Sequence, residues 1–296
     1  MSDLTLTNQN NFNQLAEAMG MSADIAVKKQ GSTLARLKID HAGVLGETVI
    51  KGKTKKVEVV DAGSYVLQLV DGDKIYQTNP KIRLFNQKFM YKKFVQGNGD
   101  TKNRYVKTVM ANDLKSDLRD TDGGFNCGKS SGWIDDYQSL PQATKDLIKS
   151  IKRVRVLFGE VTFDNPVDEK GLDVDPQKAI PFIYEIDNRD AFKIMGTPIG
   201  QMAKQNRILP KHFLQLGTEE KTIPTGVKYY LPTVELVPEV IELEIPKDQE
   251  TFANFIEWIK NYNDWVIGTH EDIIKGKADK DVKNVIDEFV DIDEAA

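Results

Sequence analysis

Apolar and polar positions alternate with a period of two along much of residues 34–95, which predicts a run of β-strands. The alternation is clearest at 34–39, 57–60 and 65–70. Asp71-Gly72-Asp73 follows the third of these segments and supplies a turn signal before the next apolar positions. Short strands joined by polar turns are typical of an antiparallel sheet, so we expect one in this part of the chain.

Strand-like segments continue beyond residue 95, while helical patterns become more frequent toward the end of the chain. We expect further strands at 104–110, 153–163, 181–186 and 229–243. We expect helices at 12–19, 141–151, 190–195, 248–266 and 270–285. The longest of these carries apolar residues at helical spacing from Phe252 to Val266, and Asp248 is its predicted start.

Many short strands followed by helices favour an α+β fold, because a chain of βαβ units would alternate the two. We therefore predict an antiparallel β-barrel core that is similar to an OB-fold, with added helices and an acidic C-terminal tail. An OB-fold receives oligonucleotides on one face, although periodicity does not separate it from other antiparallel barrels. The predicted parts are a polar N-terminal arm, a β-rich core, a helical region and the tail, at 1–33, 34–245, 246–285 and 286–296.

The composition is that of a folded chain without signs of a membrane segment or a metal centre. Of the 296 residues, 40% are apolar and 29% are charged, and no apolar run is long enough to cross a bilayer. The N-terminus shows no secretory signal, and the single cysteine, Cys127, cannot form an internal disulfide, so we expect a cytoplasmic protein. His41, His212, His270 and Cys127 lack metal-ligand spacing, so we expect no bound zinc, and Mg²⁺ on carboxylates stays open. We predict no metal site and no cofactor.

Charge divides the chain into a basic middle and an acidic end. Residues 51–155 hold 21 Lys and Arg against 12 Asp and Glu, whereas residues 235–296 hold 6 Lys against 17 Asp and Glu. The formal net charge of −5 conceals both segments. A polyanion is attracted by the first and repelled by the second, so the two can compete for one surface. This arrangement suggests a nucleic-acid-binding protein with a regulatory acidic tail.

Basic and aromatic residues are densest at 81–94. As one regular strand, this segment has a first face made of Arg83, Phe85, Gln87, Phe89, Tyr91 and Lys93. Its second face includes Lys88 and Lys92, and the mixture continues at Arg104, Tyr105 and Lys107. Single-strand binders combine cations for phosphates with rings that stack on bases, worth roughly 1–3 kcal/mol per base. We predict that these residues bind nucleic acid, and the alternative for each ring is a place in the core.

Two further basic segments are predicted to contact phosphates. The first is a turn between strands that carries Lys51, Lys53, Lys55 and Lys56, and its alternative is a solvated hairpin tip. The second is the strand at 153–163, where Arg153 and Arg155 share one face. That pair either follows the phosphates of a bound strand or forms salt bridges with nearby carboxylates.

The glycine-rich segment at 123–130 fits the phosphate-loop pattern G-x-x-x-x-G-K-[ST], with Lys129 and Ser130 at its end. In a nucleotide hydrolase this loop follows a buried strand and opens a helix. Here the preceding residues are too polar for a buried strand, and Gly132 interrupts the start of any helix. We therefore expect a surface loop without catalysis, whose Lys129 and Trp133 contact a nucleic-acid strand.

The last eleven residues mix acidic and apolar side chains without any base. Acidic residues interleaved with apolar ones suit a short motif that docks on basic, partly hydrophobic patches. The alternative is the frayed end of a helix. The predicted partner-binding residues are Asp287, Glu288, Phe289, Asp291, Ile292, Asp293 and Glu294.

This layout, with rings and cations before an acidic tail that bears Phe289, resembles the single-stranded-DNA-binding proteins of bacteriophage replication. The resemblance covers residues 34–160 and 284–296 and concerns organisation, without a diagnostic motif. It implies a tail that shields the DNA site and recruits replication enzymes, in a host cytoplasm. Phe289 lies seven residues before the end, whereas phage T7-type tails finish on their aromatic residue, and no T4-type zinc motif is present.

The sequence therefore predicts a non-enzymatic, sequence-tolerant single-stranded-DNA-binding protein of replication or recombination. Its expected partners are single-stranded DNA and, through the tail, replication or recombination proteins, with no membrane. Homo-oligomerisation stays open. The alternatives are a nucleotide hydrolase that uses Lys129 and Ser130, and a phage structural or assembly protein whose basic middle contacts other subunits.

Overall fold

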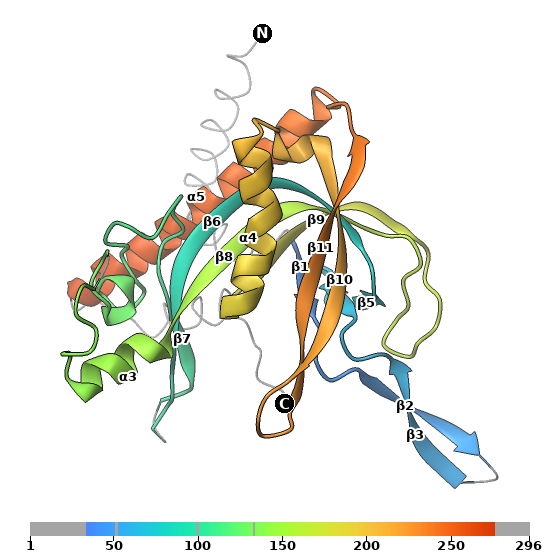
Figure 1. The fold of residues 1–296 in the computed structure, drawn as a ribbon, viewed down its shortest axis with the longest axis horizontal. Coiled ribbons are helices and arrows are strands. Elements are labelled where there is room, and N and C mark those ends of the chain that lie inside the picture. Colours follow the sequence, from blue (N-terminus) through green and yellow to red (C-terminus); the bar gives the residue numbers. More distant parts are fainter. Residues whose placement is uncertain (1–33, 51–52, 99–100, 133, 276–296) are drawn as a thin grey trace, which may run out of the picture. The chain divides into compact units, whose positions relative to one another are not determined.

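The computed structural model describes residues 34–50, 53–98, 101–132 and 134–275. Figure 1 shows its strands, β1 to β11, and its helices, α3 to α5, with most of them labelled. The predicted N-terminal arm with its helix at 12–19, and the predicted acidic tail, lie outside the described residues.

Nine strands form one large mixed sheet. Eight of them follow the order β11-β10-β6-β8-β9-β1-β4-β5, and β7 pairs with the end of β6. Most neighbours are antiparallel, but β1 and β9 are parallel. The strands are β1 (Ala35–Ile39), β4 (Tyr65–Gln68), β5 (Lys74–Gln77), β6 (Lys81–Val95), β7 (Arg104–Lys107), β8 (Ile151–Phe163), β9 (Gln177–Ile186), β10 (His212–Thr222) and β11 (Lys228–Val240).

The prediction of an OB-like antiparallel barrel is wrong. Among the described strands, β11 and β5 stand at the two ends of the order and no pairing joins them, so the sheet is open. The parallel pairing of β1 with β9 also departs from an all-antiparallel barrel. Periodicity reveals which segments are strands, whereas the choice of neighbours depends on contacts between distant segments.

Strands β2 (Val44–Ile50) and β3 (Lys53–Val60) form a separate antiparallel ribbon that projects from the main sheet (Figure 1). A small apolar cluster of Val60, Val66 and Tyr76 anchors its base. Of the predicted basic turn, Lys53, Lys55 and Lys56 belong to strand β3 of this ribbon, and Lys51 lies outside the described residues.

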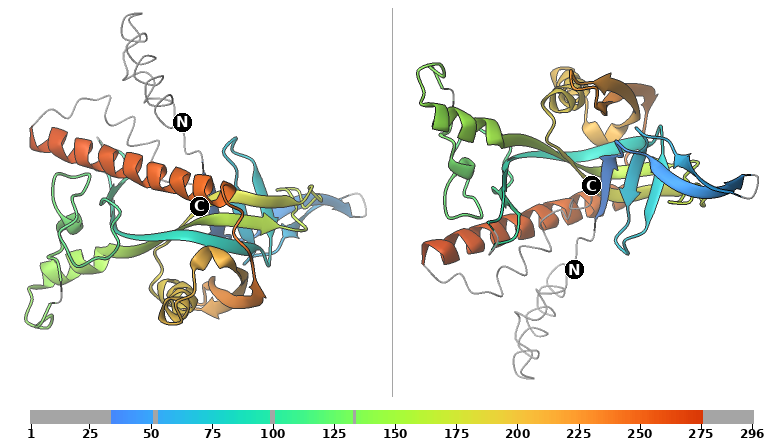
Figure 2. Two further views of the ribbon diagram at one scale, coloured as in Figure 1. Left: turned by 90° about the horizontal axis from the view of Figure 1, so that it is seen from above. Right: turned by 90° about the horizontal axis from the view of Figure 1, so that it is seen from below.

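Helices α4 (Arg189–Lys204) and α5 (Lys247–Ile274) cover opposite faces of the sheet (Figure 2), which we call the α4 face and the α5 face. Adjacent residues of β6 confirm this placement. The ring of Phe89 lies 5.9 Å from that of Phe192 in α4, and the Tyr262 hydroxyl of α5 donates to Met90. Helix α3 (Gln142–Ser150) leads directly into β8, and two short 3₁₀ turns, η1 (Asn126–Gly128) and η2 (Leu209–Lys211), complete the elements.

The main hydrophobic core lies between the sheet and α4. Ala191, Met195, Ile199 and Met202 repeat every three or four residues and are buried, so one stripe of α4 faces the core. This packing extends α4 well beyond the predicted helix at 190–195, across Pro198. The burial of apolar side chains outweighs the local helix-breaking preference of Pro, which costs about 3 kcal/mol in a helix interior.

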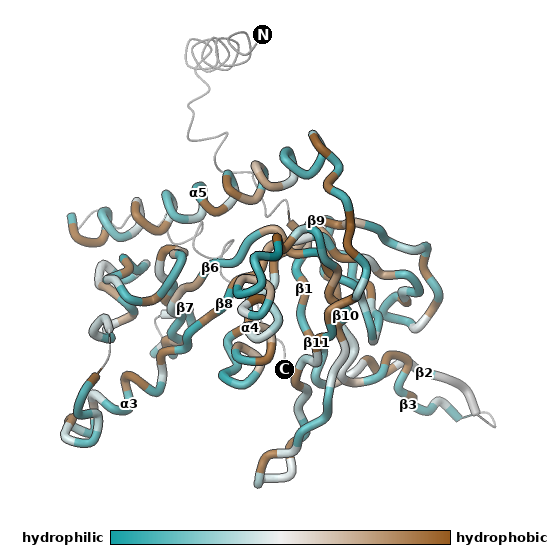
Figure 3. The backbone as a smooth tube through the Cα atoms, turned by 45° about the horizontal axis from the view of Figure 1, so that its top comes forward, coloured by the Kyte–Doolittle hydropathy of each residue, from teal (hydrophilic) through white to brown (hydrophobic). Residues whose placement is uncertain are grey.

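A second layer of rings joins α5 to the opposite face. Phe255 lies 5.8 Å from Phe85 and 5.9 Å from Phe158, and Trp258 lies 5.6 Å from Phe158. Hydrophobic and hydrophilic residues alternate along α5, as expected for a helix with one buried stripe (Figure 3). The predicted helix at 248–266 and the first residues of the one predicted at 270–285 form a single helix through Ile274, and positions 276–285 lie outside the described residues. No described helix is both long and apolar enough to span a membrane.

Candidate nucleic-acid interface

The pair of strands β6 and β8 carries many of the predicted binding residues, and a β-bulge divides them between the two faces. Leu84 pairs with Gly159, but the next pair in the register is Asn86 with Phe158. Phe85 is the extra residue, so the alternation of faces shifts by one position after it. At the bulge, β8 approaches β6 so closely that position 159 requires a glycine. A Cβ at Gly159 would lie 2.3 Å from the backbone oxygen of Arg83 in β6.

This bulge corrects the prediction that one face of β6 carries the whole set. Arg83 and Phe85 contact residues of α5. Phe89, Tyr91 and Lys93 lie on the α4 face, because Phe89 contacts α4 and the three alternate along the strand. The predicted set is therefore two groups with different surroundings.

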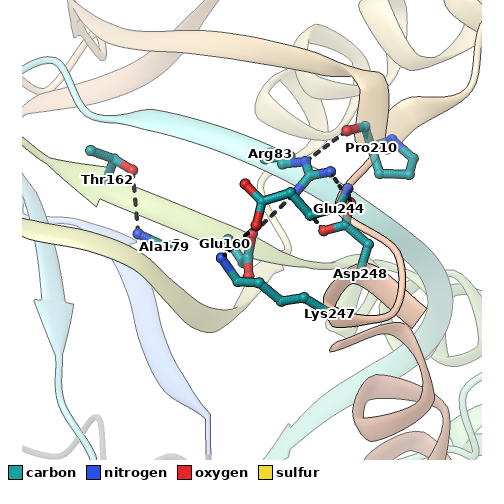
Figure 4. Close-up of polar contacts among 8 residues, drawn as sticks. All are labelled: Arg83, Glu160, Thr162, Ala179, Pro210, Glu244, Lys247 and Asp248. Atoms are coloured by element: carbon teal, nitrogen blue, oxygen red, sulfur yellow. Dashed lines mark hydrogen bonds and ion pairs between the residues drawn. The ribbon is translucent and has the colours of Figure 1, made fainter. Parts of the chain in front are cut away.

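On the α5 face, Arg83 belongs to a buried ion cluster (Figure 4). Its guanidinium donates to both carboxylate oxygens of Asp248, at 2.7 and 2.6 Å, and lies 3.5 Å from a carboxylate oxygen of Glu160. Its Nε donates to the carbonyl oxygen of Pro210. Asp248, the predicted first residue of the helix, also accepts a hydrogen bond from the backbone N–H of Glu244. These contacts make Arg83 a structural link between β6 and the start of α5.

Lys92 and Lys107 form a second buried group with Glu185 on the same face. Lys107 Nζ lies 3.1 Å and Lys92 Nζ 3.7 Å from carboxylate oxygens of Glu185. Burial by itself would raise the pKa of Glu185, but Lys107, Lys92 and Arg36 outweigh it and lower that pKa to about 2. Burial lowers the pKa of Lys107 in spite of this carboxylate. These two lysines therefore form ion pairs with a buried carboxylate and are not available to bind a ligand.

The α4 face presents a different pattern, in which rings and cations alternate across the two strands. Phe89 pairs with Arg155, and Tyr91 pairs with Arg153. Lys129, from the loop after η1, lies with its Nζ 5.5 Å from the centre of the Tyr91 ring. Tyr91 itself is buried, so its ring supports the cations and is not exposed for stacking.

Arg155 is the most enclosed cation on this face, with only 9% of its surface exposed. Its Nε donates to the carbonyl oxygen of Phe192, and its Nη1 donates to Gln87. The guanidinium carbon lies 5.0 Å from the centre of the Phe89 ring and 4.5 Å from that of Phe192. Burial lowers the pKa of Arg155, and within the described residues no carboxylate forms an ion pair with it.

Arg153 and Lys129 provide exposed and half-exposed positive charge next to Tyr91. Burial and the nearby charge of Arg153 together lower the pKa of Lys129. Lys129 Nζ donates to the carbonyl oxygen of Ser130, and Lys93 Nζ donates to that of Cys127. In the described part of the chain, none of these cations is ion-paired with a carboxylate. Two like charges held near each other favour the binding of an anion between them.

The other predicted residues lie apart from this face or outside the described ranges. Arg104 forms a salt bridge with Asp122 at 2.7 Å, and Lys88 Nζ donates to the Asn112 side chain. The Tyr105 ring contacts that of Phe94. Lys53, Lys55 and Lys56 are exposed on the β2–β3 ribbon. The residues that the structure does not describe are Lys51, Trp133 and the tail residues Asp287, Glu288, Phe289, Asp291, Ile292, Asp293 and Glu294.

The glycine-rich loop at 123–130 wraps around the buried carboxylate of Asp120. Backbone N–H groups of Asp122 and Gly124 donate to one oxygen at 3.0 and 2.8 Å, and that of Cys127 donates to the other at 2.9 Å. In a phosphate loop such N–H groups cradle the phosphates. Here an internal carboxylate occupies several of them, and among the described residues no helix follows Lys129 until α3. This geometry lends no support to a nucleotide hydrolase.

Sequence reasoning missed two cations that α4 adds to this face. Lys193 and Lys204 line the same groove as Arg155. Both are exposed, and neither forms an ion pair among the described residues. Their eleven-residue separation places them on one side of a helix, a signal that becomes visible only when the helix is known to continue to Lys204.

Comparison of the chain with protein-family models, with curated proteins and with solved structures found no match. Among the described residues, no group of three or more His, Cys, Asp or Glu side chains is arranged to hold a metal ion. The α4 face is therefore the feature of the molecule that bears on its function.

Proposed function

We propose that this chain binds single-stranded nucleic acid on the α4 face, through Arg153, Arg155 and Lys129 together with Lys193 and Lys204 of α4. The observation that supports the proposal is the contrast between the two faces of the sheet. The buried cations of the α5 face are neutralised by Asp248, Glu160 and Glu185, whereas those of the α4 face have no carboxylate partner among the described residues.

A surface of this kind suits a polyanion. Arg and Lys side chains that replace counterions on phosphates supply most of the affinity of sequence-tolerant binders. Contacts with phosphates fix the position of a strand without reading its bases. Cations interleaved with rings are typical of proteins that bind single strands. We further propose that the strand is DNA in replication or recombination, in keeping with the predicted organisation of the chain.

The acidic segment at 286–296 stays a prediction from the sequence. Its charge opposes that of the α4 face, so we propose that it competes with the strand and recruits other proteins of the same process.

Arg153 and Lys152 allow a matched test of this proposal. They are neighbours on β8 and both are exposed, but Lys152 pairs with Lys92 across the strands and therefore lies on the α5 face. Replacing Arg153 with Gln should weaken binding of oligo(dT), and should make the slope of log K against log salt shallower by about 0.7 for one lost phosphate contact. The Lys152→Gln variant should bind as the unaltered protein does.

The measurement is a fluorescence-anisotropy titration of labelled oligo(dT) at several salt concentrations. Thermal melts of both variants check that each remains folded, since an exposed ion pair such as that of Lys152 with Asp187 contributes only about 0–1 kcal/mol. Equal losses of affinity in the two variants would contradict a binding site on the α4 face.

A further inference from the structure

A groove of about 480 Å³ lies between α4 and the neighbouring part of β8. Arg155 contributes to it from the strand, and Lys193 and Lys204 contribute from the helix. No acidic residue lines it. Three cations around one small groove repel one another, and an anion between them relieves that repulsion.

Arg155 lines this groove, and one nitrogen of its guanidinium has no hydrogen-bond partner among the described residues. Its Nε and Nη1 are occupied by Phe192 and Gln87, while Nη2 makes no hydrogen bond within the described residues. A Cβ built on Gly196, which lines the groove, would lie 2.3 Å from Nη2. An alanine at that position would force the guanidinium to move. Neutral partners therefore hold Arg155 in place, and the N–H groups of its Nη2 remain free to donate to a ligand.

The helix also allows a ligand to approach closely. Gly200 lines the groove one turn after Gly196, and a Cβ there would meet no other atom within 4 Å. The backbone of α4 is thus uncovered beside the three cations. A buried cation without an anionic partner is costly, so an anion that enters here gains more than it would on an ordinary exposed surface.

We infer that this groove is a phosphate-binding subsite, in which Arg155 binds one phosphate group of a bound nucleic-acid strand and Lys193 and Lys204 of α4 add positive charge along the groove. The planar guanidinium matches the oxygens of a phosphate, and the two flexible ammonium groups supply further charge. This inference rests on the proposed function and deepens it, because it identifies one position on the α4 face that binds the sugar–phosphate backbone of the nucleic acid.

Gly200→Glu tests the subsite, and Gly268→Glu is its matched control. Both glycines are exposed in helices, and a Cβ at either meets no atom within 4 Å, but Gly268 belongs to α5 on the opposite face. The carboxylate at position 200 should enter the groove and neutralise it. We expect the affinity for oligo(dT) to fall roughly tenfold at about 50 mM salt, the effect of one lost phosphate contact. The control should retain the affinity of the unaltered protein.

A second measurement uses inorganic phosphate and does not depend on strand binding. The NMR signal of the Arg155 Nε–H group should move during a titration with phosphate, and should move less with chloride at equal ionic strength. The Gly200→Glu variant should lose the specific response, while Gly268→Glu should keep it.

The outcomes separate the subsite from the proposed function. If oligo(dT) binds and both glutamate variants bind it equally well, the subsite is contradicted and the proposed function survives. If the unaltered protein does not bind oligo(dT), the proposed function fails, and a specific response of Arg155 to phosphate would then assign the groove to a free phosphate group. Equal responses to phosphate and chloride would overturn the inference of a phosphate site.

Discussion

Arg83 and Arg155 show how the surroundings of a residue decide its role. Both lie in the central pair of strands, and both are at least nine-tenths buried. Arg83 is held by two carboxylates, so its charge is neutralised and it fastens α5 to the sheet. Arg155 is held by a carbonyl and an amide, so its charge stays available. The same side chain is structural in the first setting and suited to binding in the second.

Glu185 is the residue whose removal should destabilise the fold most clearly on the α5 face. In the Glu185→Gln variant, Lys92 and Lys107 would stay buried without a negative partner. Breaking a buried pair in this way costs about 3–5 kcal/mol. Urea-induced unfolding at pH 7, followed by circular dichroism, measures the loss.

The pH dependence of that loss has a definite sign. Folding lowers the pKa of Glu185 to about 2, so the stabilisation is present above the pKa of the unfolded chain, about 4.3, and is lost as the pH falls toward 2. The difference in unfolding free energy between the unaltered protein and Glu185→Gln should therefore shrink over this interval. A difference that stays constant from pH 7 to pH 2.5 would contradict a charged Glu185.

The sequence indicates which residues are basic or aromatic, but it does not reveal their partners. Arg83 and Asp248 are 165 positions apart, and their contact forms only after β6 and α5 come together. Lys107 was predicted to bind nucleic acid because it follows Arg104 and Tyr105, yet it is buried beside Glu185. Local pattern cannot separate a cation bound to a distant carboxylate from a free one.

At the scale of elements, α4 shows tertiary packing overriding local preference. Gly196, Pro198 and Gly200 all disfavour a helix, and the predicted helix ended at residue 195. The buried stripe from Ala191 to Met202 carries the helix through them. By contrast, β10 was missed although His212, Leu214 and Leu216 alternate as a strand requires, so that signal was present in the sequence.

The two glycines of α4 should respond in opposite ways to alanine. Gly200→Ala should stabilise the protein by about 0.5–1 kcal/mol, because alanine favours helices and the site has space. Gly196→Ala should destabilise it by about 1–3 kcal/mol, because the new methyl group displaces the Arg155 guanidinium. Thermal melts of the two variants, one helical turn apart, measure this difference. Stabilisation by both alanines would show that Arg155 is not held as described.

The bulge at Phe85 is the element that most changes the expected binding surface. Residues before and after it were predicted to share one face, because a regular strand alternates without interruption. One extra residue reverses that assignment for the second half of β6. Gly159 on the partner strand makes the bulge possible, and nothing in β6 alone reveals it.

For the whole molecule, the strands were largely predictable and their arrangement was not. The chain has the expected strand-rich first half, but the sheet is open and mixed, with β1 placed between β9 and β4. The basic middle of the sequence is divided between the two faces of the sheet. Sequence position groups its basic residues together, whereas in the structure Arg83, Lys92 and Lys107 lie beside carboxylates on the α5 face, and Arg153 and Arg155 have no carboxylate partner among the described residues on the α4 face.

The most direct test of the proposed function is a titration of the full chain with labelled oligo(dT) and with a duplex of equal length, across a range of salt concentrations. We expect tighter binding of the single strand, and a log K that falls with log salt by about 0.7 for each phosphate contacted. Contacts from Arg153, Arg155 and Lys129 together would give a slope of about −2 or steeper. A slope near zero, or equal affinity for duplex and single strand, would contradict a single-strand site on the α4 face.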